Sequence, residues 1–197
     1  MNVFNEHPFK VLFDYGHNAH AVGMMADLAS RLDVTGRRIV VLAGPGDRRD
    51  EDLVAIAKAV AGRFDHYICR RDDNLRNRAT DEVPRIQAQA LRAAGVPESA
   101  ISIIPDEQDA IDAALRMGEP GDLLLIFADA LVRSWKQITK FKSVNSAAAA
   151  PPPRAPRPAP EPLAAEKNDI AAASPEFNMD GLIRDERGVR LAPENDD

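Results

Sequence analysis

Short apolar segments alternate along this chain with stretches in which apolar residues recur every three or four positions. The segments predict five buried strands, at residues 9–14, 38–43, 65–69, 101–104 and 123–127, and residues 1–5 fit an additional edge strand. Uninterrupted apolar strands are typical of a sheet that helices cover on both faces. The pattern therefore predicts an α/β fold with a doubly wound, mainly parallel sheet of the Rossmann-like kind.

Each predicted strand is followed by a predicted helix with one apolar face. The five faces comprise Val22, Met25, Leu28, Ala29 and Leu32; Leu53, Ile56, Ala57, Val60 and Ala61; Val83, Ile86, Ala90 and Leu91; Ala110, Ile111, Ala114 and Leu115; and Leu131, Trp135 and Ile138.

The periodic pattern ends near Phe141, which divides the chain into three parts. Residues 1–142 predict one folded domain. Residues 143–176 form a Pro/Ala-rich segment, with seven of the 15 prolines between positions 151 and 162, and its composition predicts a disordered linker. Residues 177–197 are a charged C-terminal segment, for which two interpretations stay open: a mobile terminus, or a short segment that docks on another domain or chain.

Composition narrows the class of protein. The formal net charge of −6 is unfavourable for a protein whose main role is to bind nucleic acid phosphates. Cys69 is the single cysteine, and no apolar leader follows Met1, so we expect a cytoplasmic protein. No stretch approaches the roughly 20 apolar residues of a membrane-spanning helix.

The loops that follow the strands hold most of the candidate chemistry, because ligands of open α/β sheets bind at the carboxyl ends of strands. After the first main strand comes DYGHN. Its Asp14 could accept hydrogen bonds from ribose hydroxyls, and Asn18 could cap a helix that faces a phosphate. The alternative is purely structural, a strand-end acid and a helix cap. His17 and His20 do not have the spacing of a zinc site.

The second and third strands are followed by GPGDRRD and by RRDD. Arginines beside carboxylates at a helix start suit an anionic or zwitterionic ligand, although they also suit helix capping. The glycines lack the third position of the dinucleotide fingerprint, and the sequence contains neither a P-loop nor a G-x-S-x-G elbow. Hydride transfer, unaided ATP activation and serine hydrolysis are therefore disfavoured.

Four segments together resemble a known family: VLFDYGHN, VVLAGPGDRRDEDL, FDHYICRRDDNLRNR and PGDLLLIFADALVRSWKQI. They are similar, in the correct order, to the C-terminal domain of the cyanophycin synthetase family, within the Mur ligase and folylpolyglutamate synthetase superfamily. The resemblance covers residues 1–141. It implies a domain that closes over ATP and an incoming amino acid, with ATP and Mg²⁺ shared with a central P-loop domain and no metal bound by this domain alone.

The resemblance also implies roles for individual residues. Asp14 would bind the nucleotide ribose, and Tyr15, His17 and Asn18 would line the nucleotide side of the cleft. The guanidinium or ammonium group of the incoming arginine or lysine would be bound by carboxylates, for which the candidates are Asp47, Asp50, Asp72 and Asp73. The carboxylate of the same amino acid would be held by an arginine, either Arg48 or Arg71. The position after Asn18 is Ala19, where the family usually has proline.

The family resemblance further implies partners. They are the central P-loop domain and an ATP-grasp domain of the same enzyme, a polymer with a polyaspartate backbone as substrate, and assembly into homo-oligomers. An arginine that the superfamily often has just before this region does not occur, which suggests a gene fragment or a separately expressed subunit. The alternative function is a stand-alone nucleotide-binding or scaffolding module without catalysis.

Overall fold

The computed structural model describes residues 1–142, 182–185 and 188–191, and the chain divides into two compact units, Met1–Pro160 and Glu161–Asp197. The strands of the first unit are β1 (Asn2–Phe4), β2 (Lys10–Asp14), β3 (Arg38–Leu42), β4 (His66–Cys69), β5 (Ile101–Ile103) and β6 (Leu123–Phe127). Its helices are α1 (Ala19–Arg31), α2 (Asp50–Val60), α3 (Glu82–Ala93), α4 (Glu107–Met117) and α5 (Leu131–Lys140), with a short 3₁₀ turn at Glu98–Ala100.

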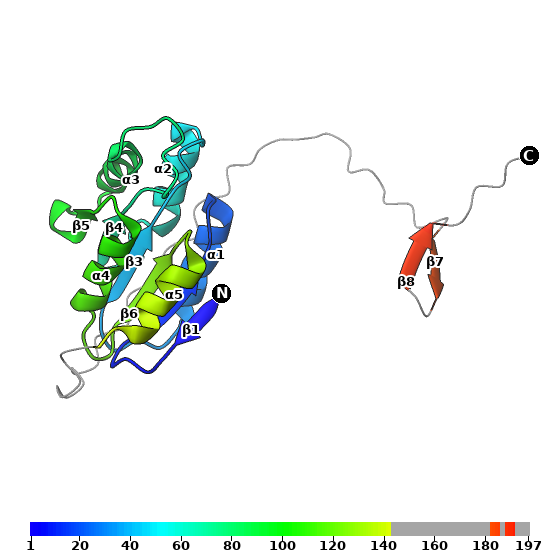
Figure 1. Cartoon of the computed structure of the whole chain (residues 1–197), viewed down its shortest axis with the longest axis horizontal. Helices are drawn as coiled ribbons and strands as arrows, with labels where there is room; N and C mark the ends of the chain where they lie inside the picture. The colour runs from blue at the N-terminus through cyan, green and yellow to red at the C-terminus, as the bar shows by residue number, and fades with distance from the viewer. Residues whose placement is uncertain (143–181, 186–187, 192–197) are drawn as a thin grey trace, which may run out of the picture. The chain divides into compact units, whose positions relative to one another are not determined.

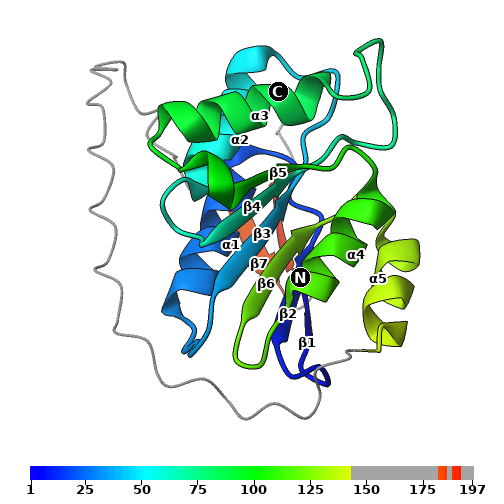
Figure 2. The same cartoon turned by 90° about the vertical axis from the view of Figure 1, so that its left-hand side faces the viewer.

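The six strands form one sheet in the order β1-β2-β6-β3-β4-β5. Only β1 runs antiparallel to its neighbour, and the other four pairings are parallel. Helices α1, α2 and α3 cover one face of the sheet and α4 and α5 cover the other (Figures 1 and 2). The predicted doubly wound sheet is confirmed, and residues 1–5 do contribute the edge strand.

The core lies on both faces of the sheet, because successive side chains of a strand point to opposite sides. In β2, Leu12 packs with α1 and α2, whereas Val11 and Phe13 pack with α4 and α5. All five residues of β6 are buried, as the uninterrupted LLLIF run predicts for a central strand.

Two predicted helix faces differ in detail from those observed. In α5, Leu131 is 42% exposed and the buried residues are Ser134 and Ile138. In α3, Gln87 is buried while Ile86 is only half-buried, because the Gln87 amide donates a hydrogen bond to the Ala43 carbonyl at 3.0 Å. A polar side chain can thus take a core position when it finds a hydrogen-bond partner in the core.

The second unit contains an antiparallel strand pair, β7 (Leu182–Asp185) and β8 (Gly188–Leu191), in which Leu182 is opposite Leu191. The charged segment at 177–197 therefore includes regular structure that the sequence pattern did not predict. The predicted linker at 143–176 lies outside the described residues. No helix within the described ranges is long and apolar enough to cross a membrane.

Candidate functional site

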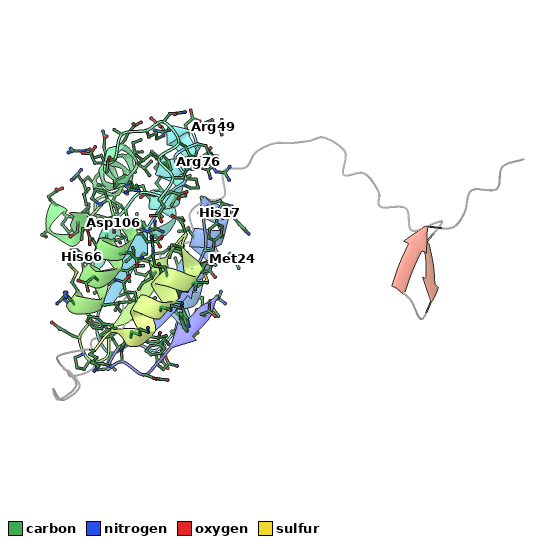
Figure 3. The ribbon with its side chains drawn as sticks, in the orientation of Figure 1. His17, Met24, Arg49, His66, Arg76 and Asp106 are labelled. Atoms are coloured by element: carbon green, nitrogen blue, oxygen red, sulfur yellow. The ribbon has the colours of Figure 1, made fainter. Side chains whose placement is uncertain are left out.

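Four loops meet at the carboxyl edge of the sheet: the β2–α1 loop (residues 15–18), the β3–α2 loop (43–49), the β4–α3 loop (70–81) and the β6–α5 loop (128–130). His17, Arg49 and Arg76 come from the first three and lie toward the same end of the domain (Figure 3). By contrast, His66 begins β4 and belongs to the opposite edge of the sheet. The sequence thus predicted correctly which loops share an edge.

Asp14 ends β2 beside β6, opposite Phe127. Its Oδ1 accepts a hydrogen bond from the Gly16 N–H at 2.9 Å, and its Oδ2 lies 2.9 Å from the Met1 amino group. Partial burial raises the pKa of this carboxyl, but the Gly16 N–H and the Met1 ammonium lower it by more, so the net pKa lies below its ordinary 3.8. Asp14 is therefore an ionised acceptor at neutral pH.

A glycine is required at position 16 because the loop passes directly over the Phe127 ring. A Cβ there would lie 2.6 Å from a ring carbon of Phe127, closer than van der Waals contact allows. The Tyr15 side chain points outward and is 49% exposed, with its ring centroid 4.9 Å from that of His17. The β2–α1 loop is thus held against Phe127 on its inner side, while its outer side is exposed and accessible to a ligand.

Asn18 caps α1, and its Oδ1 accepts a hydrogen bond from the Ala21 N–H at 2.9 Å. This is the structural role that the sequence left open, and it does not use the side-chain NH2 group of Asn18, which can donate to a ligand. Asn18 also lines a pocket of about 100 Å³ between the β2–α1 loop and α2. The other lining residues are His17, Ala19, Arg48, Asp52, Ala55 and Ile56.

This pocket brings together His17, Asn18 and Arg48, which the sequence analysis had assigned to two different ligands. Asp14 and Tyr15 are not among its lining residues, although both belong to the same loop or its strand. The pocket combines the N-terminus of α1, an imidazole and the Arg48 side chain with an apolar wall, and the Asp52 carboxylate that also lines it is paired with Arg49 at 3.3 Å. Such a combination favours an anionic group attached to a less polar body.

The acids of the β3–α2 loop and the start of α2 already have cationic partners within the chain. Asp47 pairs with Arg76, and Asp50 pairs with Arg78 at 2.8 Å. Arg78 also donates to the carbonyls of Gly46 at 2.9 Å and Arg48 at 2.7 Å. A guanidinium of the protein therefore stands at both sites where the sequence predicted one from a substrate.

The β4–α3 loop holds the other predicted acids. Asp73 pairs with Arg133 at 2.7 Å. Burial first, and the nearby Asp129 carboxylate second, raise the pKa of Asp72 above its ordinary 3.8. Arg71 turns back on its own loop and donates to the carbonyls of Asp72 and Asp73 at 3.0 and 3.3 Å, while its buried Nε has no hydrogen-bond partner among the described residues.

A buried ionic network behind these loops was missed by the sequence reasoning. Arg70 and Glu107 are fully buried and lie 3.1 Å apart, and Arg70 also pairs with Asp129 at 3.0 Å. Glu107 accepts hydrogen bonds from the Asp129 N–H at 2.7 Å and the Ser134 hydroxyl at 2.6 Å. The network joins the ends of β4 and β6 to the first turn of α4.

No sequence signal separates these residues from surface charges. Glu107 follows the helix cap Asp106 and has the position of an ordinary first-turn acid, while Arg70 is one of two consecutive arginines. Arg70 is separated from Glu107 by 37 positions and from Asp129 by 59, so only the fold identifies these pairs. Across the described ranges, no group of three or more His, Cys, Asp or Glu side chains could hold a metal ion.

Comparison with known proteins gives consistent matches. The family model described as "Mur ligase, glutamate ligase domain" matches residues 1–130. A cyanophycin synthetase of Geminocystis herdmanii (strain PCC 6308) is 36% identical over 141 residues, covering 72% of this chain and 16% of the relative. One from Trichormus variabilis (strain ATCC 29413 / PCC 7937) is 38% identical over 145 residues, covering 70% and 15%. The chain thus spans only about a sixth of the length of these relatives.

Solved structures agree on the fold. A UDP-N-acetylmuramoyl-L-alanyl-D-glutamate–2,6-diaminopimelate ligase superposes with a TM-score of 0.53 at 19% identity, covering 71% of this chain and 31% of that one. A Mycobacterium tuberculosis folylpolyglutamate synthase complexed with ADP and AMPPCP gives 0.52 at 18% identity, covering 72% and 32%. At these identities the likeness establishes the fold alone.

Proposed function

Because the chain belongs to the Mur ligase C-terminal (glutamate ligase) domain family, we propose that it closes the active site of an ATP-dependent amide ligase of the cyanophycin synthetase type. In this role it covers ATP and the incoming arginine or lysine while an isopeptide bond forms on an aspartate side chain. The observation that carries the proposal is the convergence of His17, Asn18 and Arg48 on one pocket at the carboxyl edge of the sheet.

The nucleotide side of this proposal rests on Asp14 and the β2–α1 loop. The Gly16 N–H lowers the pKa of Asp14 independently of the Met1 ammonium, and an ionised carboxylate can accept hydrogen bonds from ribose hydroxyls. The pocket beside the loop is about 100 Å³, whereas sites for small-molecule ligands are roughly 300–1,000 Å³. This domain can therefore enclose only part of a nucleotide. We propose that a central P-loop domain of the complete enzyme holds the remaining phosphates and Mg²⁺.

The ion pairs within the chain reduce the number of acids that are available to bind the incoming basic amino acid. Asp47, Asp50 and Asp73 each have an arginine partner in the described part of the chain. Asp72 has no such ion pair there, and a cation arriving beside it would relieve its repulsion with Asp129. We favour Asp72 as the acceptor of the basic side chain and Arg48, which reaches the pocket, as the group that holds the carboxylate.

The test is a chimeric ligase in which residues 1–142 replace the matching region of the Geminocystis herdmanii relative. We expect arginine-dependent phosphate release from the chimera in the presence of ATP, Mg²⁺ and a polyaspartate-backbone primer. Asp14→Asn should weaken ATP binding for this step by about ten- to a hundredfold, because a charge-assisted hydrogen bond contributes roughly 1.5–3 kcal/mol. Aspartate addition, at a different ATP site in the ATP-grasp domain, should be unchanged.

Asp33→Asn supplies the matched control, since it removes the same charge from an exposed position before β3, at the opposite edge of the sheet. It should leave both activities intact. If Asp14→Asn changed neither activity and only lowered the melting temperature, Asp14 would be a structural strand-end acid. The nucleotide assignment would then be wrong.

A further inference from the structure

Arg78 connects three separate elements although it is only 16% exposed. Its Nε donates to the Gly46 carbonyl at 2.9 Å, and its Nη2 donates to the Arg48 carbonyl at 2.7 Å and faces Asp50 at 2.8 Å. Its Nη1 donates to Glu82 at 2.7 Å. Each guanidinium nitrogen therefore has a partner within the protein. Arg78 is not available to bind a ligand, so its role must be exerted through its neighbours.

The contacts require the planar fork of an arginine. Two backbone carbonyls and two carboxylates, from the β3–α2 loop, α2 and α3, surround one guanidinium. A lysine offers three donors on a single nitrogen and cannot reach the same four acceptors together. The position is therefore specific for arginine and not only for positive charge.

The backbone around Arg78 is also specialised. Arg76 and Asn77 adopt φ values of 48° and 69°, in the left-handed region that residues other than glycine rarely occupy. Such conformations persist where the surroundings determine them. Here the β4–α3 loop passes so close to the β3–α2 loop that a Cβ at Gly46 would collide with the Leu75 carbonyl. The Asp47–Arg76 ion pair adds a second connection between the two loops.

We propose that Arg78 is a positioning residue that joins the β3–α2 and β4–α3 loops into one rigid unit. Its contacts with the Gly46 and Arg48 carbonyls hold the β3–α2 backbone against the β4–α3 loop, which also contains Asp72. In this way Arg78 sets the separation between the Arg48 guanidinium, proposed to hold the substrate carboxylate, and the Asp72 carboxylate, proposed to hold its basic side chain. The loop coupling stands on the contacts alone. Its consequence for amino-acid recognition rests on the proposed function.

The first measurement is made on the complete 197-residue chain by ¹⁵N relaxation. In Arg78→Gln, order parameters at residues 46–49 and 75–77 should fall from about 0.85, typical of rigid backbone, toward about 0.6, while those of β6 stay unchanged. Arg116→Gln, which removes an exposed arginine paired with Asp112 on α4, is the matched control and should change neither loop. Glu82→Gln weakens one contact of Arg78 and should loosen the loops to a smaller extent.

The second measurement is titration of the same variants with L-arginine, followed by the amide shifts of Arg48 and Asp72. Arg78→Gln should weaken binding by about tenfold or more, because misplacement costs a charge-assisted contact. Arg78→Lys should not restore the affinity, since a lysine keeps the positive charge but cannot make the guanidinium contacts that connect the two loops.

The outcomes separate the two claims. Unchanged order parameters in Arg78→Gln and Glu82→Gln would overturn the loop coupling, and loosened loops with unchanged arginine affinity would overturn the positioning role. An unsubstituted chain that shows no arginine-induced shifts would count against the proposed amino-acid site itself, and the order parameters alone would then decide the coupling.

Discussion

Replacing Glu107 by Gln should be among the most destabilising single changes in the domain. Glu107 is fully buried, lies 3.1 Å from the Arg70 guanidinium and accepts hydrogen bonds from the Asp129 N–H and the Ser134 hydroxyl. The amide keeps the size of the side chain but removes its charge and turns one acceptor into a donor. Among the described residues, Arg70 then stays in the core with Asp129 as its single ionic partner.

The expected loss follows from the cost of leaving a buried charge partly unpaired. Breaking a buried ion pair by removing one partner costs roughly 3–5 kcal/mol. Because Arg70 retains Asp129 and the Phe127 carbonyl, we take the lower end, about 3 kcal/mol. For a domain of this size each kcal/mol corresponds to roughly 2–4 °C, so the melting temperature should fall by about 6–12 °C.

Urea unfolding followed by the fluorescence of Trp135, the single tryptophan, measures this loss. Arg116→Gln is the control, because it breaks an exposed ion pair with Asp112 and should leave the midpoint unchanged. A double replacement, Arg70→Met with Glu107→Leu, should be less destabilising than Arg70→Met alone, since it does not leave the fully buried Glu107 carboxylate without its arginine. A loss below about 0.5 kcal/mol in Glu107→Gln would refute the argument.

Three further predictions concern the rest of the chain. The pKa of Asp72 is raised in the folded state, so folding favours the protonated carboxyl. The stability that Asp72 contributes is complete below its ordinary pKa of 3.8 and is lost as the pH rises through the raised pKa. Asp72→Asn should therefore raise the melting temperature at about pH 7 and leave it unchanged at about pH 3. A chain that ends at Lys142 should melt within error of the full chain, because every core residue in the described part of the chain precedes it; a loss of several degrees would contradict this. The isolated chain should release no phosphate from ATP above a heat-treated control, because its sequence contains no P-loop.

The strands were predictable because each is a short apolar run bounded by polar residues. The segment at 123–127 coincides with β6, and that at 38–43 exceeds β3 by one residue. Periodicity failed where a polar residue is buried. Ser134 takes a core position in α5 because its hydroxyl donates to Glu107, and Leu131 is exposed although the pattern placed it on the inner face.

The sequence also predicted which loops share the carboxyl edge, since this follows from strand direction alone. It did not predict how their charges pair. The Arg78 contacts with Gly46 and Arg48 join positions about 30 residues apart and depend on backbone carbonyls, which have no sequence signature. For the same reason the Arg70–Glu107 pair could not be distinguished from surface charges.

The strand order has a consequence for the way the chain is made. The last strand of the sheet to leave the ribosome, β6, is inserted between β2 and β3, which have no pairing with each other. Until residues 123–127 emerge, the β1–β2 pair and the β3–β4–β5 group have no strand hydrogen bonds in common. Contacts over such long sequence separations slow folding and expose unpaired strand edges in the meantime. The strand hydrogen bonds that link β2 to β3 through β6 therefore form only at the end of the domain's synthesis, whereas the direct packing of α1 on α2 beside the pocket does not depend on β6.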